Sequence, residues 1–385
     1  MPSAHQKRLF AAACAGIFGF GLVIGFLGPL FPFPRFQEIL AGDSSRQGSL
    51  SGILYAGVLA ATPFVGPVID RFGNKLVLVA SSIVVAASLA GFAVLATYPQ
   101  ALAAAAALGL GGGGLNIAAN ALTADVFGDR RGPFLNYLGI FFGIGGLFVP
   151  TLVLAARHVS LAVVIVAAMA LPVAFALAFA LMEFPAAHHA RGFELAEVLR
   201  VARYPGVLMF AALLFFESGA EATLGMWNPT FAHYLGAGSV NSSAAAEAYL
   251  AFVMLGRIAA GYLLRRISKT QLVVASAAAG TLACLFLAVA PSFPVLVLAS
   301  ALVGLATAAI YPTALAVAGD RYQRFAATVF SLIFTVALVG GWVFPKSAGI
   351  LAGRYGVRSP MFLPAAGLAL VLMVALRLRA SEAPL

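Results

Sequence analysis

Long apolar stretches separated by short polar breaks run along the whole chain. Twelve of them approach the length of about 20 residues that a membrane-crossing helix needs. They lie near 10–33, 48–68, 76–97, 101–123, 133–156, 159–182, 205–235, 246–264, 270–290, 294–317, 326–350 and 359–376. The stretches are apolar on every side and do not alternate like barrel strands, so they predict α-helices. The pattern therefore predicts an all-α integral membrane protein with twelve transmembrane helices.

The longest polar interruption falls near the middle of the chain, from Glu183 to Arg203. It divides the predicted helices into an N-terminal six-helix bundle over 1–182 and a C-terminal six-helix bundle over 205–385. The segment 183–204 between them is predicted to be a cytoplasmic linker loop. Its part from Phe193 to Val201 fits either a short amphipathic helix on the membrane face or a flexible tether.

Composition and charge agree with a membrane protein and exclude a nucleic-acid partner. Hydrophobic residues make up 62% of the chain and charged residues 9%, and the formal net charge is +10. The basic residues come in twos and threes between apolar stretches instead of forming a patch, so we interpret them as topology signals. With the N-terminus inside, sixteen of the 23 Lys and Arg residues fall on the cytoplasmic side and five outside. This predicts a multi-pass protein of a bacterial-type inner membrane, with both termini cytoplasmic and the lipid bilayer as a partner.

The two halves of the chain look like copies of one another. Gly66 and Arg71 follow the second predicted span, and Gly261 and Arg266 follow the eighth at an offset of 195. The tripeptide Gly-Asp-Arg also recurs, at 128–130 and 319–321, at an offset of 191. Two similar bundles that rock about a central site can expose that site to one side of the membrane at a time.

The segment GPVIDRFGNK, from Gly66 to Lys75, resembles the signature between the second and third helices of the major facilitator superfamily. The resemblance implies pseudo-symmetric six-helix bundles that transport a small solute by alternating access. It also implies a conformational latch, formed by Gly66, Asp70, Arg71 and Gly73, in which Asp70 lies against a helix N-terminus and Arg71 and Gly73 shape the turn. The second copy has Arg265 where Asp70 would align, so the complete latch is expected in the first half alone.

Two acids, Glu217 and Glu221, lie deep inside a predicted span. Their spacing of four places them on one face of the helix. A carboxylate at this depth is costly, so it should be paired, protonated or exposed to a wet cavity. Two interpretations stay open: a structural bridge to Arg257 or Lys346, or ion coupling in which a proton or sodium ion makes and breaks such a pair. No cofactor other than this coupling ion, and no metal site, is expected.

Neutral polar residues of the fourth and fifth spans are candidates for solute binding. Asn116 and Asn120 lie one turn apart, and Asn136 opens the fifth span. Carboxamides that face a cavity offer both donors and acceptors, which suits hydroxyl-rich solutes. Hydrogen bonds between helices are the alternative interpretation.

The segments GLNIAANAL and FFESGAEATLGMW resemble the fucose, galactose and hexuronate symporters and the sodium-dependent glucose transporters. The resemblance implies a sugar as substrate, with Glu221, Trp227 and Asn228 in the seventh helix and Tyr311 in the tenth among its contacts. Asn116 replaces a Glu of the fucose symporters, and their first-span Asp is missing. Proton coupling by those two residues is therefore not expected here.

The sequence favours a monomeric, ion-coupled sugar symporter over three other functions. A proton-coupled efflux antiporter for drugs would favour a Gly-Pro pair in the fifth span, which the chain matches only in part. A membrane enzyme is not expected, because no His lies deep inside a span and no Ser/His/Asp or metal-ligand cluster occurs beyond His188 and His189 in the central loop. His233 lies near the outer end of its helix, where an interfacial position is expected. A receptor built on a transporter fold would bind solute without moving it.

Overall fold

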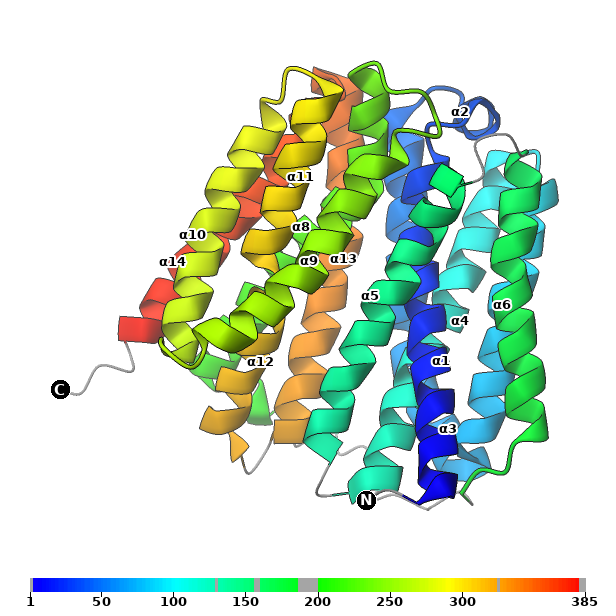
Figure 1. Ribbon diagram of the computed structural model, residues 1–385, viewed down its shortest axis with the longest axis vertical. Coiled ribbons are helices and arrows are strands. Elements are labelled where there is room, and N and C mark those ends of the chain that lie inside the picture. The colour runs from blue at the N-terminus through cyan, green and yellow to red at the C-terminus, as the bar shows by residue number, and fades with distance from the viewer. Residues whose placement is uncertain (1–2, 129–130, 156–159, 186–199, 324–325, 381–385) are drawn as a thin grey trace. The chain divides into compact units, whose positions relative to one another are not determined.

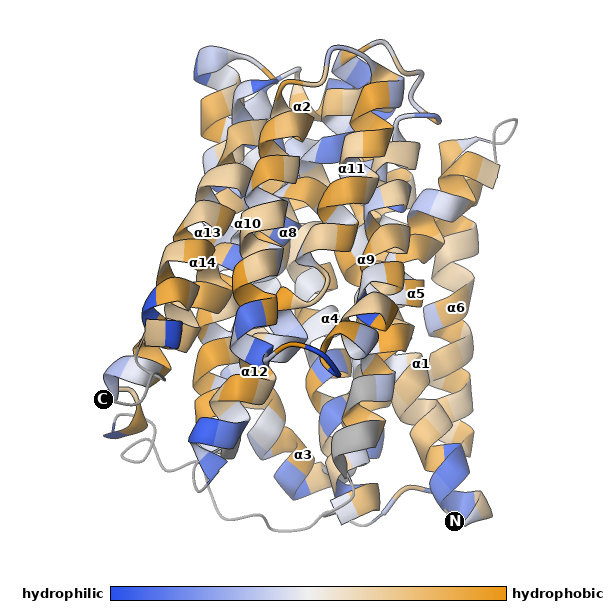
Figure 2. Cartoon of the chain, turned by 60° about the vertical axis from the view of Figure 1, so that its left-hand side comes forward, coloured by the Kyte–Doolittle hydropathy of each residue, from blue (hydrophilic) through white to orange (hydrophobic). Residues whose placement is uncertain are grey.

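The computed structural model describes residues 3–128, 131–155, 160–185, 200–323 and 326–380, apart from the side chains of 131–133, 136, 326 and 327. These residues are mostly helical and contain no strand (Figure 1). The helices are apolar along most of their length, with polar residues near their ends (Figure 2). The prediction of an all-α protein is confirmed. Most of the predicted linker 183–204 lies outside the described residues.

The first half of the chain begins with α1 and ends with α6. Its helices are α1 (Ala4–Phe26), η1 (Gly28–Leu30), α2 (Pro34–Leu40), α3 (Ser44–Val94), α4 (Tyr98–Phe127), α5 (Arg131–Ala155) and α6 (Leu161–Leu181). The first span ends at Phe26 instead of the predicted position 33, because glycine and prolines at 28, 29, 32 and 34 interrupt the helix. The short α2 that follows was not predicted.

The second half begins with α8 and ends with α14. Its helices are α8 (Pro205–Tyr234), α9 (Ser243–Leu263), α10 (Lys269–Ala288), α11 (Phe293–Thr307), α12 (Ile310–Arg321), α13 (Ala326–Tyr355), η4 (Ser359–Met361) and α14 (Phe362–Ala380). The predicted span 294–317 is thus two helices, α11 and α12, separated at Ala308 and Ala309.

Among the described residues, eleven helical segments are long and apolar enough to cross a membrane. One of them is α3, whose 51 residues contain the second predicted span and the third as far as Val94. Gly73 divides it with a φ of 83° and a ψ of 165°, a conformation that glycine adopts without strain. With α3 counted as two spans, the described helices supply the twelve that the hydropathy pattern predicts.

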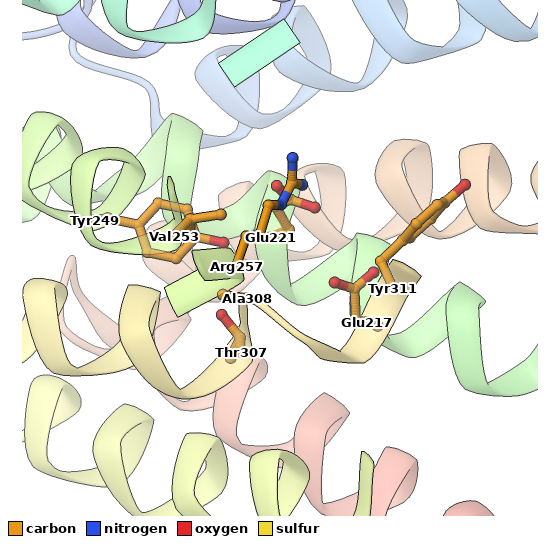
Figure 3. Close-up of a pocket in the computed structure, with 8 residues that line it drawn as sticks. All are labelled: Glu217, Glu221, Tyr249, Val253, Arg257, Thr307, Ala308 and Tyr311. Carbon is orange, nitrogen blue, oxygen red and sulfur yellow. The ribbon is translucent and has the colours of Figure 1, made fainter. Parts of the chain in front are cut away.

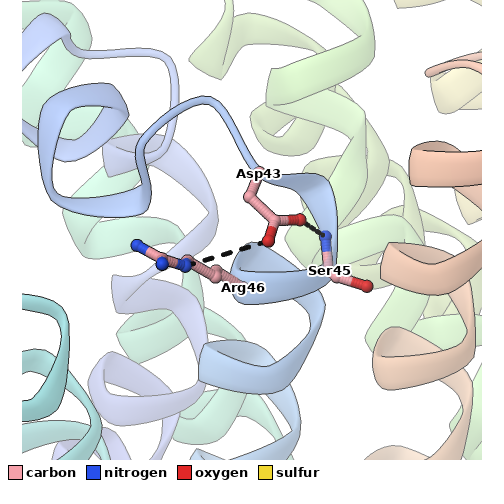
Figure 4. A network of polar contacts seen from close by, with 3 residues as sticks. All are labelled: Asp43, Ser45 and Arg46. Atoms are coloured by element: carbon pink, nitrogen blue, oxygen red, sulfur yellow. Dashed lines mark hydrogen bonds and ion pairs between the residues drawn. The ribbon is translucent and has the colours of Figure 1, made fainter.

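The start of α3 is set by a local polar network (Figure 4). The Asp43 carboxylate accepts a hydrogen bond of 2.7 Å from the Ser45 backbone N–H, and it lies 3.8 Å from Nε of Arg46. An Asp before the first turn satisfies an N–H group that has no partner inside the helix.

Contacts between Cα atoms divide the chain into two compact units. One comprises Met1–Leu30, Pro34–Ala41 and Ile53–Gly192, and the other comprises Phe31–Phe33, Gly42–Gly52 and Phe193–Leu385. The first turns of α3 therefore pack with the second unit. There Gln47 donates a hydrogen bond of 2.8 Å to Oγ1 of Thr230 on α8.

The internal repeat is visible as the same helix contact made in both units. In the first unit, a Cβ at Gly109 of α4 would lie 2.9 Å from the carbonyl carbon of Leu54 on α3. In the second, a Cβ at Gly304 of α11 would lie 3.1 Å from the carbonyl carbon of Tyr249 on α9. Both members of the contact are displaced by 195 residues, the offset that the sequence repeats predicted.

A polar contact repeats at the same offset. Asn74 Nδ2 donates a hydrogen bond of 3.1 Å to Oδ2 of Asp125, and Lys269 Nζ pairs with Oδ2 of Asp320. Asp320 therefore corresponds in space to Asp125. The Gly-Asp-Arg match at an offset of 191 aligned it instead with Asp129, which lies outside the described residues.

The close approach of α3 and α4 predicts the effect of one methyl group. Gly109→Ala should lower the stability of the protein by about 1–3 kcal/mol. The new Cβ would meet the backbone of Leu54 and Gly57 on α3, which cannot move aside as a flexible side chain can. The intrinsic preference of helices for Ala over Gly acts in the opposite direction but is smaller. Thermal unfolding of the purified protein measures the change.

Gly91→Ala is the matched control, since a Cβ there would meet its nearest neighbour, Ala104 Cβ, at an ordinary 3.8 Å. It should leave stability equal or slightly raised. Equal melting temperatures for the two variants would contradict the packing argument.

Candidate functional site

A small pocket in the second unit contains the two deep acids. It has about 220 Å³ of empty space, part of which is open to solvent. Its lining comes from α8, α9 and the junction of α11 with α12, and consists of Glu217, Glu221, Tyr249, Val253, Arg257, Thr307, Ala308 and Tyr311 (Figure 3). The predicted residues Glu217, Glu221, Arg257 and Tyr311 are therefore brought together, and Tyr249 and Thr307 are lining residues that the sequence analysis missed.

The charges of the pocket are close enough to interact. The carboxylates of Glu217 and Glu221 repel each other, and the Arg257 guanidinium attracts both. Glu217 is 5% exposed and accepts a hydrogen bond of 3.3 Å from the hydroxyl of Ser218. Charges at this depth are tolerated when they are compensated nearby, and Arg257 is the compensating group.

The junction of α11 and α12 forms the remaining wall of the pocket. The Ala308 N–H donates to the Gly304 carbonyl at 3.2 Å, and the Thr313 N–H donates to the Ala309 carbonyl at 3.1 Å. The Ala308 carbonyl has no helical donor, because the residue four positions later is Pro312, which lacks an N–H. This proline is the sequence signal that could have predicted the break.

The internal repeat shows what the first unit has at the equivalent positions. On α5 and α13, a Cβ at Gly145 would lie 2.9 Å from the Phe18 carbonyl carbon, and one at Gly340 would lie 2.8 Å from that of Phe215. Helix α1 therefore matches α8 at an offset of 197, while the contacting positions of α3, α4 and α5 keep the offset of 195. The counterpart of Glu217 is Phe20, and that of Glu221 is Ile24. Tyr249 corresponds to Leu54, and Arg257 to Thr62. Thr307 corresponds to Gly112, and Tyr311 to Asn116. None of these counterparts is charged, so the scaffold does not need the charged cluster in order to pack.

Lys346 lies outside the pocket lining. Its side chain is exposed on α13, with Nζ 6.0 Å from the centre of the Trp342 ring. Of the two basic residues predicted as partners for the acids, the structure places Arg257 beside them.

Trp227 and Asn228 are fully buried on α8, almost two turns beyond Glu221. Asn228 Nδ2 donates a hydrogen bond of 3.2 Å to the Ser300 hydroxyl on α11. Within the described part of the chain, the indole N–H of Trp227 and Oδ1 of Asn228 are buried without a hydrogen-bond partner. Contact of either side chain with a solute stays a prediction. It would require a conformation in which Trp227 or Asn228 is exposed.

The carboxamides of the first unit interact along their own helix. Asn120 Nδ2 on α4 donates to the Asn116 backbone carbonyl at 2.8 Å and to its Oδ1 at 3.0 Å. Asn116 is buried and Asn120 is partly exposed. Asn136 belongs to α5, and its side chain lies outside the described residues. Solute binding by all three stays a prediction.

The predicted latch residues lie at the bend of α3 and in the two turns before it. Gly73 forms the bend itself, and a Cβ at Gly66 would meet no atom within 4 Å. Asp70 is partly exposed, and the Arg71 guanidinium lies 5.1 Å from the centre of the Phe72 ring. The geometry agrees with Gly73 shaping the turn, and the latch role of Asp70 stays a prediction.

The fold and the pocket define a multi-pass helical membrane protein built from a duplicated unit, with charges buried in one copy. The sequence matches the Major Facilitator Superfamily over residues 13–345 and, in a second alignment, 248–385. The chain therefore belongs to this superfamily and is a transporter. Members of the superfamily bind small solutes within the membrane.

Curated relatives match over a limited part of the chain. Human synaptic vesicle glycoprotein 2B is 32% identical over 124 residues, which are 31% of this chain and 17% of that protein. The rat protein is 31% identical over the same shares. The matched part thus spans less than a fifth of these relatives.

Solved structures share the fold over nearly the whole chain. A bacterial homolog of the human lysosomal transporter Spinster has a TM-score of 0.80 at 13% identity, with 100% of both chains covered. The nucleoside transporter NupG has a TM-score of 0.75 at 15% identity, covering 99% of this chain and 100% of that one. The E. coli fucose:proton symporter FucP has a TM-score of 0.66 at 19% identity, covering 97% and 99%. At these identities the similarity shows the fold.

The buried contact between α8 and α11 predicts a loss of stability when its acceptor is removed. Ser300→Ala should destabilise the protein by about 1–3 kcal/mol, because the Asn228 carboxamide would lose the Ser300 partner in a buried environment. Ser331→Ala, at an exposed position of α13, is the matched control and should change little. Thermal unfolding of both variants measures the difference, and an unchanged melting temperature for Ser300→Ala would refute the importance of this contact.

Proposed function

We propose that this transporter moves a small neutral polar solute, such as a sugar, by ion-coupled symport, and that the coupling ion acts at Glu217 and Glu221. The observation that carries the proposal is the buried charged cluster in one half of a duplicated scaffold. The equivalent positions of the first half hold no charge, so packing alone does not account for two carboxylates and one guanidinium in the second.

Coupling follows from the cost of burying charge. A carboxylate inside a membrane protein is tolerated when a cation compensates it, and the compensation changes when a proton or sodium ion binds. An ion that binds one conformation more tightly than the other shifts the population between them. In a fold that works by alternating access, this links the ion gradient to the direction in which the solute site faces.

A neutral, hydroxyl-rich solute fits the remaining polar residues. Asn116 and its counterpart Tyr311 occupy equivalent positions in the two units and offer uncharged donors and acceptors. Asn120, one turn from Asn116, adds a second carboxamide. Two of the similar structures belong to a fucose:proton symporter and a nucleoside transporter, which supports a polar solute of this size.

Efflux of organic cations is the second candidate function. The pocket carries two carboxylates against one guanidinium and contains Tyr249 and Tyr311, whose aromatic rings attract cations. A thermal-shift screen of monosaccharides, amino acids, organic acids and lipophilic cations separates the two candidates. Stabilisation by lipophilic cations alone would favour efflux and contradict sugar symport.

Conservative substitution of the acids tests the coupling. In proteoliposomes, Glu221→Gln should abolish accumulation of the solute found in the screen, because Gln cannot bind the coupling ion. Exchange of labelled for unlabelled solute without a gradient should continue, because this exchange needs no net ion movement. Glu217→Gln should reduce accumulation in the same assay.

Glu38→Gln, an exposed position of α2, is the matched control and should accumulate solute like the unmodified protein. Imposing a pH gradient or a sodium gradient separately identifies the ion. Full accumulation by both Glu217→Gln and Glu221→Gln would show that these acids are structural.

We also propose that both termini face the cytoplasm, as the distribution of basic residues indicates. Arg266 follows α9 and Arg354 lies in the last turn of α13, and both are exposed. In intact cells a membrane-impermeant maleimide should label Arg354→Cys, and it should label Arg266→Cys only after permeabilisation. The natural Cys14 and Cys284 are buried and should give little background. The reverse labelling pattern would invert the topology.

A further inference from the structure

The pocket of the second unit has an unequal number of positive and negative groups. Two carboxylates, on Glu217 and Glu221, stand against one guanidinium, on Arg257. Tyrosine and threonine hydroxyls are neutral near pH 7. The titratable and charged groups facing the cluster come from α8, α9, α10 and α12, and are Glu217, Glu221, Tyr249, Arg257, Cys284 and Tyr311. With both acids ionised, the cluster carries one net negative charge.

A single uncompensated charge is unfavourable at this depth. The attraction between charges is strong where water is scarce, so Arg257 compensates one carboxylate effectively. The second carboxylate still needs one positive charge. A second cation would in turn leave the cluster positive, so the electrostatics of the pocket favour occupancy by one cation.

Oxygen atoms that could hold a cation surround the same space. Besides the two carboxylates, the lining includes the Thr307 hydroxyl and the α11–α12 junction. At this junction Pro312 leaves the Ala308 carbonyl without a helical donor. Carbonyl groups freed by a break in a transmembrane helix are used as ion ligands in transporters. The first unit lacks both features, because the counterpart of Thr307 is Gly112 and α4 continues through the equivalent positions 113 and 114.

We propose that this pocket binds one monovalent cation, a proton or a sodium ion, while Arg257 acts as a permanent internal cation that compensates the other carboxylate. The inference rests on the proposed function, since it concerns the same site. It adds the number of ions bound and gives Arg257 the role of setting that number.

Ion binding can be counted on the purified full chain in detergent, without knowledge of the solute. Radioactive sodium at alkaline pH, measured by scintillation proximity, should saturate at one site per molecule if the ion is sodium. If the ion is a proton, sodium should not bind. A pH jump followed with an indicator dye should then show one more proton taken up by the unmodified protein than by Glu221→Gln.

Substitution of Arg257 tests its role. Arg257→Gln leaves two uncompensated carboxylates, so the cation should bind at least roughly tenfold more tightly, or a second cation should bind. Arg257→Lys keeps the charge and should retain one site of similar affinity. Arg354→Gln and Glu38→Gln are the matched controls at exposed positions and should behave like the unmodified protein.

Three outcomes of these experiments would overturn the inference. A count of two in the unmodified protein, or of zero with both ions, overturns the inference, and so does equal binding by Arg257→Gln and Arg257→Lys. If Arg257→Gln does not fold, the change from one to zero in the isosteric Glu221→Gln still decides the count. One bound cation without ion-driven solute accumulation would leave this inference standing and refute the proposed coupled transport.

Discussion

The high free energy of an uncompensated charge in hydrocarbon is the constraint on which this structure depends. A single charged side chain at the centre of a transmembrane helix costs roughly 3 kcal/mol even on insertion scales that give low values. Across the described spans, the protein avoids this cost with apolar side chains and hydrogen bonds inside each helix. The cluster of Glu217, Glu221 and Arg257 is an exception, and it occurs in a pocket where the three charges act on one another. Ionisable side chains inside membrane spans are rare, and they pair with one another or line a wet cavity.

Helix packing provides the frame that holds the cluster in place. Glycines allow α4 to approach α3 and α11 to approach α9 until backbone meets backbone, at Leu54 in one unit and Tyr249 in the other. Without a hydrophobic driving force between helices in lipid, close contact of this kind supplies much of the association energy. The pocket is thus built on helices whose separation is set by steric contact.

Much of the fold follows from hydropathy, whereas the site follows from it only in part. Apolar length predicted the twelve spans, and Gly73 was recognisable as a turn inside the signature motif. A helix that is apolar on every side carries no stripe that tells which side faces its neighbours. Sequence reasoning therefore could not choose between Arg257 and Lys346 as the partner of the acids, and it placed Trp227 toward a solute although its ring is fully buried here. The break beside Ala308 was missed because apolar residues continue through it, although Pro312 marked it.

The duplication explains how one unit could acquire charges without losing its packing. The α9–α11 contact uses the backbone of Tyr249, as the α3–α4 contact uses the backbone of Leu54. Because the helix approach depends on backbone atoms and on the opposing glycine, the side chain at this position is free to change from an apolar group to a phenol. The same reasoning applies to Gly112 and Thr307, and to Asn116 and Tyr311, which occupy equivalent positions. Steric contacts thus preserve the scaffold in both halves, while the side chains that line the equivalent spaces diverge in chemistry.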